Sequence, residues 1–499
     1  MLFNSHVFIL LFLPITLLVF YWLGARFGAR VCRVWLVAAS LFYYAWWNPA
    51  YLAILIGSLL INYGIGFMLT STPDGKLKKQ VLFGGITINL AALGYYKYAN
   101  WFIDNANVLT GNNWTLEKII LPLGISFFTF QQIAFLCDAA KGETREYRFL
   151  DYALFVTFFP QLIAGPIVHH KEMMPQFARD DTYRPRWDNI SIGLTLFTLG
   201  LFKKVILADG IAGFSTSVFG AAQAGAQPGM LDAWSAALAY TFQIYFDFSG
   251  YSDMALGLAR LFGIKLPMNF FSPYKATSII DFWRRWHITL SRFLRDYLYI
   301  PLGGNRRGKT RRYLNLMITM LLGGLWHGAG WTFVIWGGLH GLYLSFNHAW
   351  RAIVKQHEEP QHGPIRWICI LFTLFWVVIA WVFFRAEQLD AALFMLQGMF
   401  GLTPLPEGAT SSLVINPAMV WVYLAILAAI AWFLPNGLQI LNRHEPCYEV
   451  REEKDAELPR WQGWLRWHPN RLWAIGMAFA LAYCILSLSR VSEFLYFQF

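Results

Sequence analysis

Apolar runs of about 17 to 25 residues recur along the whole chain, and a helical run of this length spans about 30 Å of hydrocarbon. The runs are continuous, whereas strands of an outer-membrane barrel would alternate apolar and polar residues over about ten positions. We therefore predict an all-α fold, a polytopic transmembrane helical bundle of about 11 to 13 spans with some interfacial helices.

Proline and glycine interrupt two of the predicted spans. The candidate spans 119–137 and 149–168 contain Pro122, Pro160 and Pro166 beside glycines. Irregular backbone at membrane depth is tolerated only where protein or water satisfies its polar groups. Both segments are therefore predicted to be re-entrant or broken helices.

Composition and charge fit a membrane protein. Of 499 residues, 57% are hydrophobic and 14% are charged, which excludes an ordinary soluble enzyme. The net charge of +11 would suggest nucleic-acid binding in a soluble chain, but basic residues of membrane proteins collect in cytoplasmic loops beside anionic lipids. Arg26, Arg30 and Arg33 follow the first span, so we predict an extracytoplasmic N-terminus, contact with membrane lipid and no nucleic-acid partner.

The histidines are the first candidates for chemistry. Residues 313–350 contain no Asp, Glu, Lys or Arg, and His327 lies in this run. A titratable side chain at membrane depth is a functional candidate, and a neutral imidazole can act as a general base. From position alone, a histidine hydrogen-bonded within the bundle explains His327 equally well. For His287 an interfacial anchor is the alternative, and for His340 a packing role is favoured.

Buried carboxylates form a second group. Asp247, Ser252 and Asp253 lie in an apolar segment, where they must face a polar cavity or pair with basic side chains. The two aspartates are six residues apart, about 240° around a helix, and do not form an obvious carboxylate dyad. Ion-pair scaffolding is the alternative to a tunnel-lining role. No metal-ligand spacing or nucleotide-binding loop is present, so we predict no metal and no bound cofactor.

Several long motifs carry a family resemblance. The strongest are YFDFSGYSDMA (245–255), FWRRWH (282–287), LRDYLYI (294–300) and LGGLWHG (322–328). With them the chain resembles the membrane-bound O-acyltransferase (MBOAT) family, in its bacterial alginate O-acetylation branch. The resemblance covers nearly the whole chain. We therefore predict one domain over residues 1–499, with core motifs at 120–350, C-terminal spans at 365–490 and an extracytoplasmic aromatic tail at 491–499.

The resemblance implies transfer of an acyl group from a cytoplasmic thioester, such as acetyl-CoA, through a central tunnel that crosses the fold. The invariant histidine of the family falls on His327 and its second histidine on His287. On this basis both are catalytic, with His327 deprotonating an attacking hydroxyl. The carboxylates and the serine named above would line or support the tunnel. The basic residues expected on the donor side are Arg284, Arg285 and Arg295.

The aromatic C-terminus suggests an acyl relay. Residues 494–499, FLYFQF, resemble the FxYF tail of a small membrane partner in teichoic acid D-alanylation. Our hypothesis is that Tyr496 accepts the acetyl group and passes it to a periplasmic transferase. An aromatic anchor at the membrane interface explains the segment equally well.

The leading hypothesis is a multi-pass acetyltransferase of the bacterial inner membrane, with both termini periplasmic. It would pass acetyl groups to a periplasmic acetyltransferase and other polysaccharide-acetylation proteins for O-acetylation of an exopolysaccharide, alginate first. Nothing in the sequence names the sugar, so cellulose and peptidoglycan stay open. Direct modification of the final polysaccharide hydroxyl is a second enzymatic hypothesis. A transporter or channel is disfavoured, because no pair of repeated halves is evident.

Overall fold

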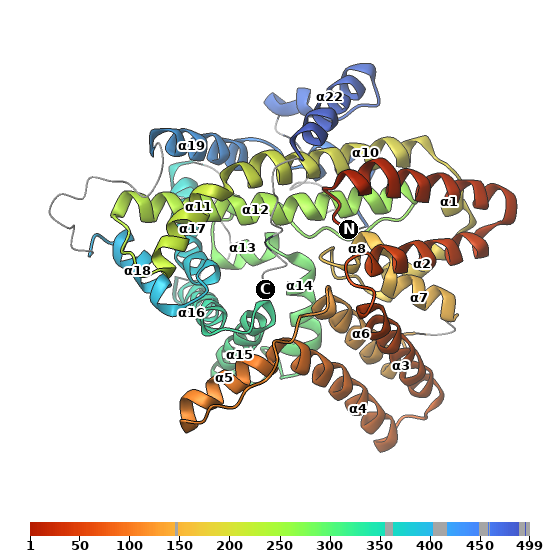
Figure 1. Ribbon diagram of the computed structural model, residues 1–499, viewed down its shortest axis with the longest axis horizontal. Helices are drawn as coiled ribbons and strands as arrows, with labels where there is room; N and C mark the ends of the chain where they lie inside the picture. Colours follow the sequence, from red (N-terminus) through yellow and green to blue (C-terminus); the bar gives the residue numbers. More distant parts are fainter. Residues whose placement is uncertain are drawn as a thin grey trace. The chain divides into compact units, whose positions relative to one another are not determined.

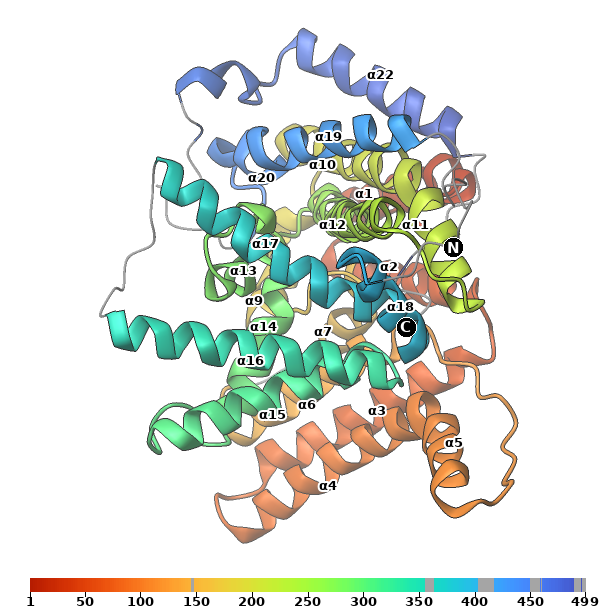
Figure 2. The same ribbon diagram turned by 90° about the vertical axis from the view of Figure 1, so that its left-hand side faces the viewer.

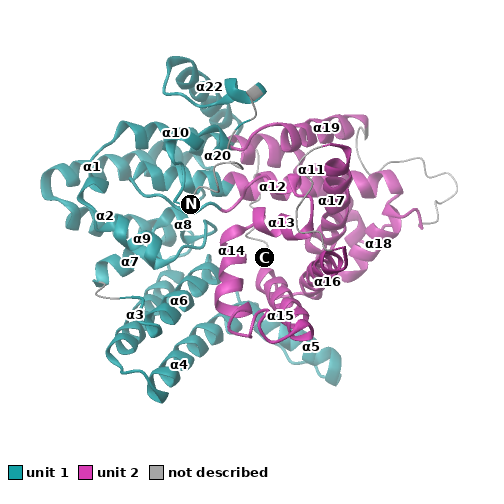
Figure 3. Ribbon diagram, turned by 180° about the vertical axis from the view of Figure 1, so that it is seen from behind, with its two compact units in different colours: residues 1–201, 251–268, 437–490 teal, residues 202–250, 269–436, 491–499 magenta. Residues whose placement is uncertain are grey.

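The computed structural model describes residues 1–144, 148–354, 363–402, 417–448, 458, 460–488 and 495. Within these ranges every regular element is a helix and no strand occurs (Figure 1). The predicted all-α fold is therefore confirmed. Contacts divide the chain into two compact units, each assembled from separate stretches of sequence (Figure 3). One domain over residues 1–499 stays a prediction.

Unit 1 contains residues 1–201, 251–268 and 437–490. In it α1 packs on α2, while α3, α4 and α6 pack against one another. Its helices are η1 (Phe8–Phe12), α1 (Leu13–Phe27), α2 (Ala29–Ala45), α3 (Tyr51–Ser71), α4 (Lys76–Leu93), η2 (Gly94–Tyr98), α5 (Ala99–Thr110), α6 (Ile125–Ala140), α7 (Phe149–Thr157), α8 (Phe159–Leu162), α9 (His170–Phe177), η3 (Asp180–Tyr183), α10 (Trp187–Phe202, whose last residue falls in unit 2), α20 (Gly437–Ile440), η7 (Asn442–His444), η8 (Arg460–Leu465) and α22 (Arg471–Ser487).

Unit 2 contains residues 202–250, 269–436 and 491–499. Helices α15 and α16 lie side by side as a hairpin (Figure 2). The helices of unit 2 are η4 (Lys203–Ala208), α11 (Asp209–Gln223), α12 (Met230–Leu261, whose end belongs to unit 1), η5 (Pro273–Lys275), α13 (Ile279–Arg285), α14 (Ile288–Leu294), η6 (Arg295–Tyr299), α15 (Lys309–His327), α16 (Trp331–Val354), α17 (Pro364–Arg385), α18 (Leu389–Met399) and α19 (Pro417–Phe433).

Several helical stretches have the length and composition of membrane spans. Among the described residues, four are long and apolar enough to cross a bilayer: Phe8–Phe27, Tyr51–Ser71, Trp187–Gln223 and Pro364–Arg385. Shorter apolar helices occur as well, among them Arg471–Ser487. These stretches fit a multi-pass membrane protein, and the count of 11 to 13 spans stays a prediction.

The two proline-interrupted segments are irregular. Residues 119–124 are not helical, and α6 begins after Gly124, whose φ of 71° is in the left-handed region. A helical span that starts at residue 119 is therefore a wrong prediction, since Pro122 and Gly124 prevent it. The other segment is divided into α7 and α8 and has no helix over 163–169, which confirms a broken helix.

Candidate active site

The hairpin of α15 and α16 determines where His327 lies. Helix α15 ends at His327 and α16 begins at Trp331, so a short turn with two glycines separates the two helices. A Cβ atom added to Gly324 or Gly337 would come under 3.0 Å from a carbonyl oxygen of the facing helix, that of Phe333 or Met320 respectively. Small residues of this kind allow helix backbones to approach closely. The glycines therefore hold α16 against the end of α15 that carries the histidine.

Aromatic rings surround His327. The side chain is buried, and its ring centroid lies 4.9 Å from that of Trp326 and 5.1 Å from those of Trp336 and Phe384. These rings come from α15, α16 and α17, so three helices fix the orientation of the imidazole. A fixed orientation of this kind is what a general base needs in order to meet the proton that it accepts.

His287 occupies a strained position between α13 and α14. Its φ of 42° and ψ of 53° are left-handed, which a non-glycine residue adopts at a cost of order 1–3 kcal/mol. The backbone N–H of Ile288 donates to the carbonyl of Asn269 at 2.9 Å, and His287 itself is fully buried. Strain of this kind persists only where surrounding structure enforces it, and it concentrates at functional sites.

Asn269 determines which nitrogen of His287 carries the proton. Its Oδ1 lies 3.0 Å from His287 Nδ1 and also accepts from the backbone N–H of Thr289 at 3.3 Å and from the Thr289 hydroxyl at 2.9 Å. Because a backbone N–H can only donate, the amide atom that faces it is the oxygen. Nδ1 of His287 therefore donates to Asn269, and the neutral imidazole has its lone pair on Nε2.

The fold brings His287 and His327 together. Their ring centroids lie 6.4 Å apart with an angle of 57° between the planes, and both belong to unit 2. The ring of Trp326 lies 6.1 Å from that of His287 and so contacts both histidines. A ligand of a few atoms could touch both imidazoles at once. The catalytic roles of the pair stay a prediction.

His340 belongs to the aromatic group behind His327. It is fully buried, and its Nδ1 accepts a hydrogen bond from Trp283 Nε1 at 3.3 Å. The ring of Trp336 lies 4.8 Å from His340 and 5.1 Å from His327. His340 thus supports the ring that packs on His327.

Asp247 forms an ion pair with Lys204, a partner that sequence reasoning did not identify. Its carboxylate lies 2.5 Å from Nζ of Lys204, which is 2.7 Å from Asp209, and the lysine side chain is 1% exposed. The backbone of Leu495, itself buried, hydrogen-bonds to Asp247. This arrangement fits the ion-pair alternative for Asp247. Lys204 interrupts the apolar run 190–207, and a lysine at that depth was the available signal.

Ser252 and Asp253 lie on the part of α12 that belongs to unit 1. Both are buried, and a Cβ atom added to Gly437 would lie 3.3 Å from Asp253 Oδ2. Asp247 belongs to the other unit, so the structure does not present the two aspartates as one group. A tunnel role for Ser252 and Asp253 stays a prediction.

The predicted donor-side arginines lie on the short helices after α12. Arg284 is exposed, Arg285 donates from Nε to both oxygens of Asp281 at 2.8 Å, and Arg295 pairs with Asp296 at 2.7 Å. Contact with a donor stays a prediction for all three. Tyr496 lies outside the described residues. In the part of the chain that is described, no three His, Cys, Asp or Glu side chains are placed to hold a metal ion.

Comparisons with known proteins give matches over most of the chain. A family model described as MBOAT, membrane-bound O-acyltransferase family, matches residues 2–386. A peptidoglycan O-acetyltransferase of Helicobacter pylori is 46% identical over 428 residues, 81% of this chain and 80% of that protein. A probable alginate O-acetylase, AlgI, of Pseudomonas putida is 39% identical over 506 residues and covers both chains fully. Its counterpart in Pseudomonas aeruginosa is 43% identical over 407 residues, 80% of this chain and 75% of that protein.

Proposed function

Since the chain belongs to the membrane-bound O-acyltransferase family, we propose that it passes an acetyl group from a cytoplasmic donor across the inner membrane for O-acetylation of an exopolysaccharide. Alginate is the leading candidate for that polysaccharide. As a member of this family it is an O-acyltransferase and a multi-pass membrane protein. The observation that carries the proposal is the buried pair of His287 and His327, 40 residues apart in sequence and 6.4 Å apart between ring centroids.

His327 is the general base in the proposed reaction. It takes the proton of the acceptor hydroxyl as that oxygen attacks the carbonyl carbon of the acetyl thioester. When the tetrahedral intermediate collapses, the carbon–sulfur bond breaks and the imidazolium gives the proton to the leaving thiolate. The products are an acetyl ester and a free thiol, and the imidazole ends neutral as it began.

His287 orients the bound substrates. Because Nδ1 is engaged by Asn269, Nε2 of the neutral imidazole can only accept, which suits it to a donor group of the substrates other than the attacking hydroxyl, whose single proton passes to His327. The donor we propose is acetyl-CoA, whose phosphates would suit the arginine-rich segment 284–312. The proposal includes periplasmic positions for both chain termini, which the basic residues after the first span support for the N-terminus.

Tyr496 is the proposed acceptor within the chain. Leu495 is buried in the core of unit 2, and its backbone bonds to Asp247, so the residue before Tyr496 is held inside the unit that contains both histidines. Acetyl-Tyr496 would then pass the group to a periplasmic acetyltransferase partner. The alternative is an aromatic anchor at the interface.

Labelled acetyl-CoA tests the reaction and the relay together. Purified full-length protein in lipid vesicles should release free CoA and acquire an ester-linked acetyl label. The variant Tyr496→Phe keeps the ring and removes the hydroxyl, so it should lose the label while keeping its abundance. Unchanged labelling of that variant would overturn the relay. Absence of both CoA release and label in the wild type would instead favour a transporter.

Peptidoglycan acetylation is the second candidate, favoured by the 46% identity to the Helicobacter pylori protein. The two candidates differ in the polymer that carries the acetyl ester. In a deletion strain, ester content should fall in the exopolysaccharide fraction and stay unchanged in muropeptides. A fall in muropeptide esters with unchanged exopolysaccharide esters would show that the protein serves peptidoglycan acetylation.

A further inference from the structure

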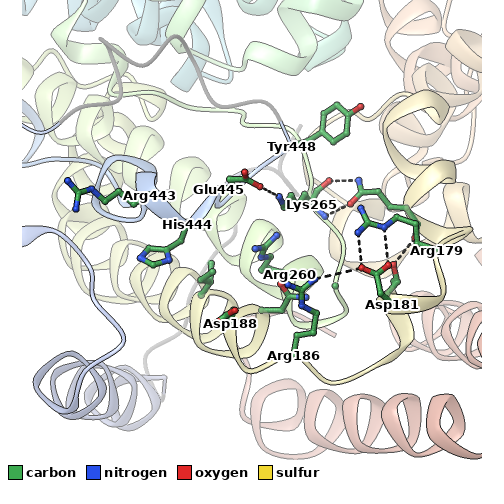
Figure 4. Close-up of a pocket in the computed structure, with 15 residues that line it drawn as sticks. Arg179, Asp181, Arg186, Asp188, Arg260, Lys265, Arg443, His444, Glu445 and Tyr448 are labelled. Atoms are coloured by element: carbon green, nitrogen blue, oxygen red, sulfur yellow. Dashed lines mark hydrogen bonds and ion pairs between the residues drawn. The ribbon is translucent and has the colours of Figure 1, made fainter.

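A charged pocket lies in unit 1, and neither His287 nor His327 lines it. Its volume is about 570 Å³, and its walls come from the end of α9, η3 and the start of α10, from the end of α12 with the following turn, and from η7 with the residues after it (Figure 4). This volume is in the range of small-molecule sites. All the lining residues belong to unit 1.

The pocket has more positive than negative side chains. Five basic residues line it against three carboxylates, so two positive charges are in excess, and His444 adds a further donor. The basic residues are Arg179, Arg186, Arg260, Lys265 and Arg443, and the carboxylates are Asp181, Asp188 and Glu445. A pocket with this balance favours an anion.

Two of the carboxylates already have basic partners. Asp181 accepts from Arg179 at 3.0 and 2.7 Å, and Arg186 lies 3.7 Å from it. Glu445 is bonded to Lys265. These partners hold the pKa of Asp181 and of Glu445 below the usual range, so both carboxylates stay charged and occupied near neutral pH. They are poorly placed to satisfy another buried cation as well.

Arg260 is that buried cation. Its side chain is 8% exposed, and within the described ranges its Nε has no hydrogen-bond partner. Figure 4 shows it reaching into the pocket among Arg186, Asp188 and Glu445. The two carboxylates attract Arg260 electrostatically, but among the described residues neither forms an ion pair with it within 4.0 Å. A buried guanidinium N–H without a hydrogen-bond partner is costly unless a ligand supplies one.

The pocket lies beside the end of α1 that is predicted to be cytoplasmic. The Tyr21 hydroxyl donates to the carbonyl of Leu261 at 2.5 Å, next to Arg260 in sequence. The backbone of Gly24 packs so closely on the Tyr183 carbonyl that a Cβ atom there would lie under 3.0 Å from it. The cytoplasmic face is where anionic lipid headgroups and phosphate-bearing metabolites are both available.

We propose that Arg260 and the basic residues around it bind a phosphate group at the cytoplasmic face, carried either by an anionic lipid headgroup or by a soluble phosphate-bearing ligand. The planar fork of a guanidinium matches two oxygens of a phosphate, which a point charge does not. The inference is independent of the acetyl-transfer site, since it uses no residue of unit 2.

Binding by the purified full-length protein tests the proposal in two arms. The first measures the shift in unfolding temperature as inorganic phosphate is added in detergent. The second uses native mass spectrometry to compare retention of phosphatidylglycerol and phosphatidylcholine. A shift with inorganic phosphate alone would identify a soluble source, and selective retention of phosphatidylglycerol would identify a lipid source. Absence of both effects in the wild type would overturn the site.

Single-residue variants test whether the binding depends on this pocket. Arg260→Gln should weaken the wild-type effect about tenfold, because it removes the charge and the fork. Arg30→Gln removes the same charge from an exposed position outside the pocket and should bind as the wild type does. Should Arg260→Gln fail to fold, Arg443→Gln replaces an exposed lining residue and should weaken binding to a smaller extent. Wild-type binding by a folded Arg260→Gln protein, or by Arg443→Gln in its place, would overturn the proposal.

Discussion

At the scale of single residues, a variant of Asn269 tests whether the reaction depends on the fixed orientation of His287. Its Oδ1 holds Nδ1 of His287, so Asn269→Ala should let the imidazole change tautomer and rotate. We expect kcat for acetyl-CoA turnover to fall about tenfold or more while KM changes little. The measurement is CoA release by membranes that contain equal amounts of protein.

The conservative variant Asn269→Asp serves as the matched control. It keeps an oxygen for His287 and for the backbone N–H of Thr289, so it should retain more activity than Asn269→Ala. Equal activity of Asn269→Ala and the wild type would show that His287 needs no fixed tautomer.

The buried ion pair predicts a stability effect. Lys204→Met would leave Asp247 and Asp209 without their shared cation, and removal of one partner of a buried pair costs about 3–5 kcal/mol. The apparent melting temperature in detergent should fall clearly. Lys78→Met breaks an exposed pair with Asp74 and should cost less than about 1 kcal/mol. Similar melting temperatures for the two variants would show that Lys204 is not essential to the core.

The sequence located some of these residues and not others for physical reasons. His327 could be found because a run without charged residues made it conspicuous, and Asp247 because a carboxylate at membrane depth needs a partner. Asn269 gave no such signal, since its role depends on backbone hydrogen bonds between 269–271 and 285–288, two stretches that are separated in sequence. Lys204 carried a signal that is meaningful only once its depth in an apolar run is considered.

At the scale of elements, the contact between α15 and α16 depends on glycine. Gly337→Ala would place a methyl group under 3.0 Å from the Met320 carbonyl, so the helices must separate, at a cost of roughly 1–3 kcal/mol. Because α15 ends at His327, activity should fall with stability. The neighbouring Gly338→Ala meets Leu321 at 3.5 Å, an ordinary contact, and should leave both unchanged.

Melting temperature and CoA release of the two alanine variants provide the measurement. If Gly337→Ala matches Gly338→Ala in both, close packing of the hairpin does not position the histidine.

The long apolar helices could be predicted from the sequence, whereas the irregular segments between helices were harder to predict. Residues 51–71 form the long helix α3 because the hydropathy of this stretch is uninterrupted. Helix α6 begins at Ile125, six residues after the predicted start, because Pro122 and a left-handed Gly124 outweigh the apolar character of 119–123. The left-handed conformation of His287, between α13 and α14, could not be predicted, since tertiary contacts impose it.

At the scale of the whole molecule, the histidine pair, the buried Lys204 and the described residue of the C-terminal tail all belong to unit 2. The phosphate site that we propose belongs to unit 1. The two proposals can therefore fail separately. Loss of acetylation with intact phosphate binding, or the reverse, would show which unit an altered residue serves.

The acetyl content of secreted polysaccharide tests the central claim most directly. A deletion strain is complemented with wild type, with His327→Ala, or with His468→Ala, whose histidine is exposed and belongs to unit 1. Membrane abundance of the three proteins is matched. We predict that His327→Ala abolishes polymer acetylation while secretion continues, and that His468→Ala supports it fully. Wild-type acetylation in the His327→Ala strain would contradict the role of His327 as the base in acyl transfer.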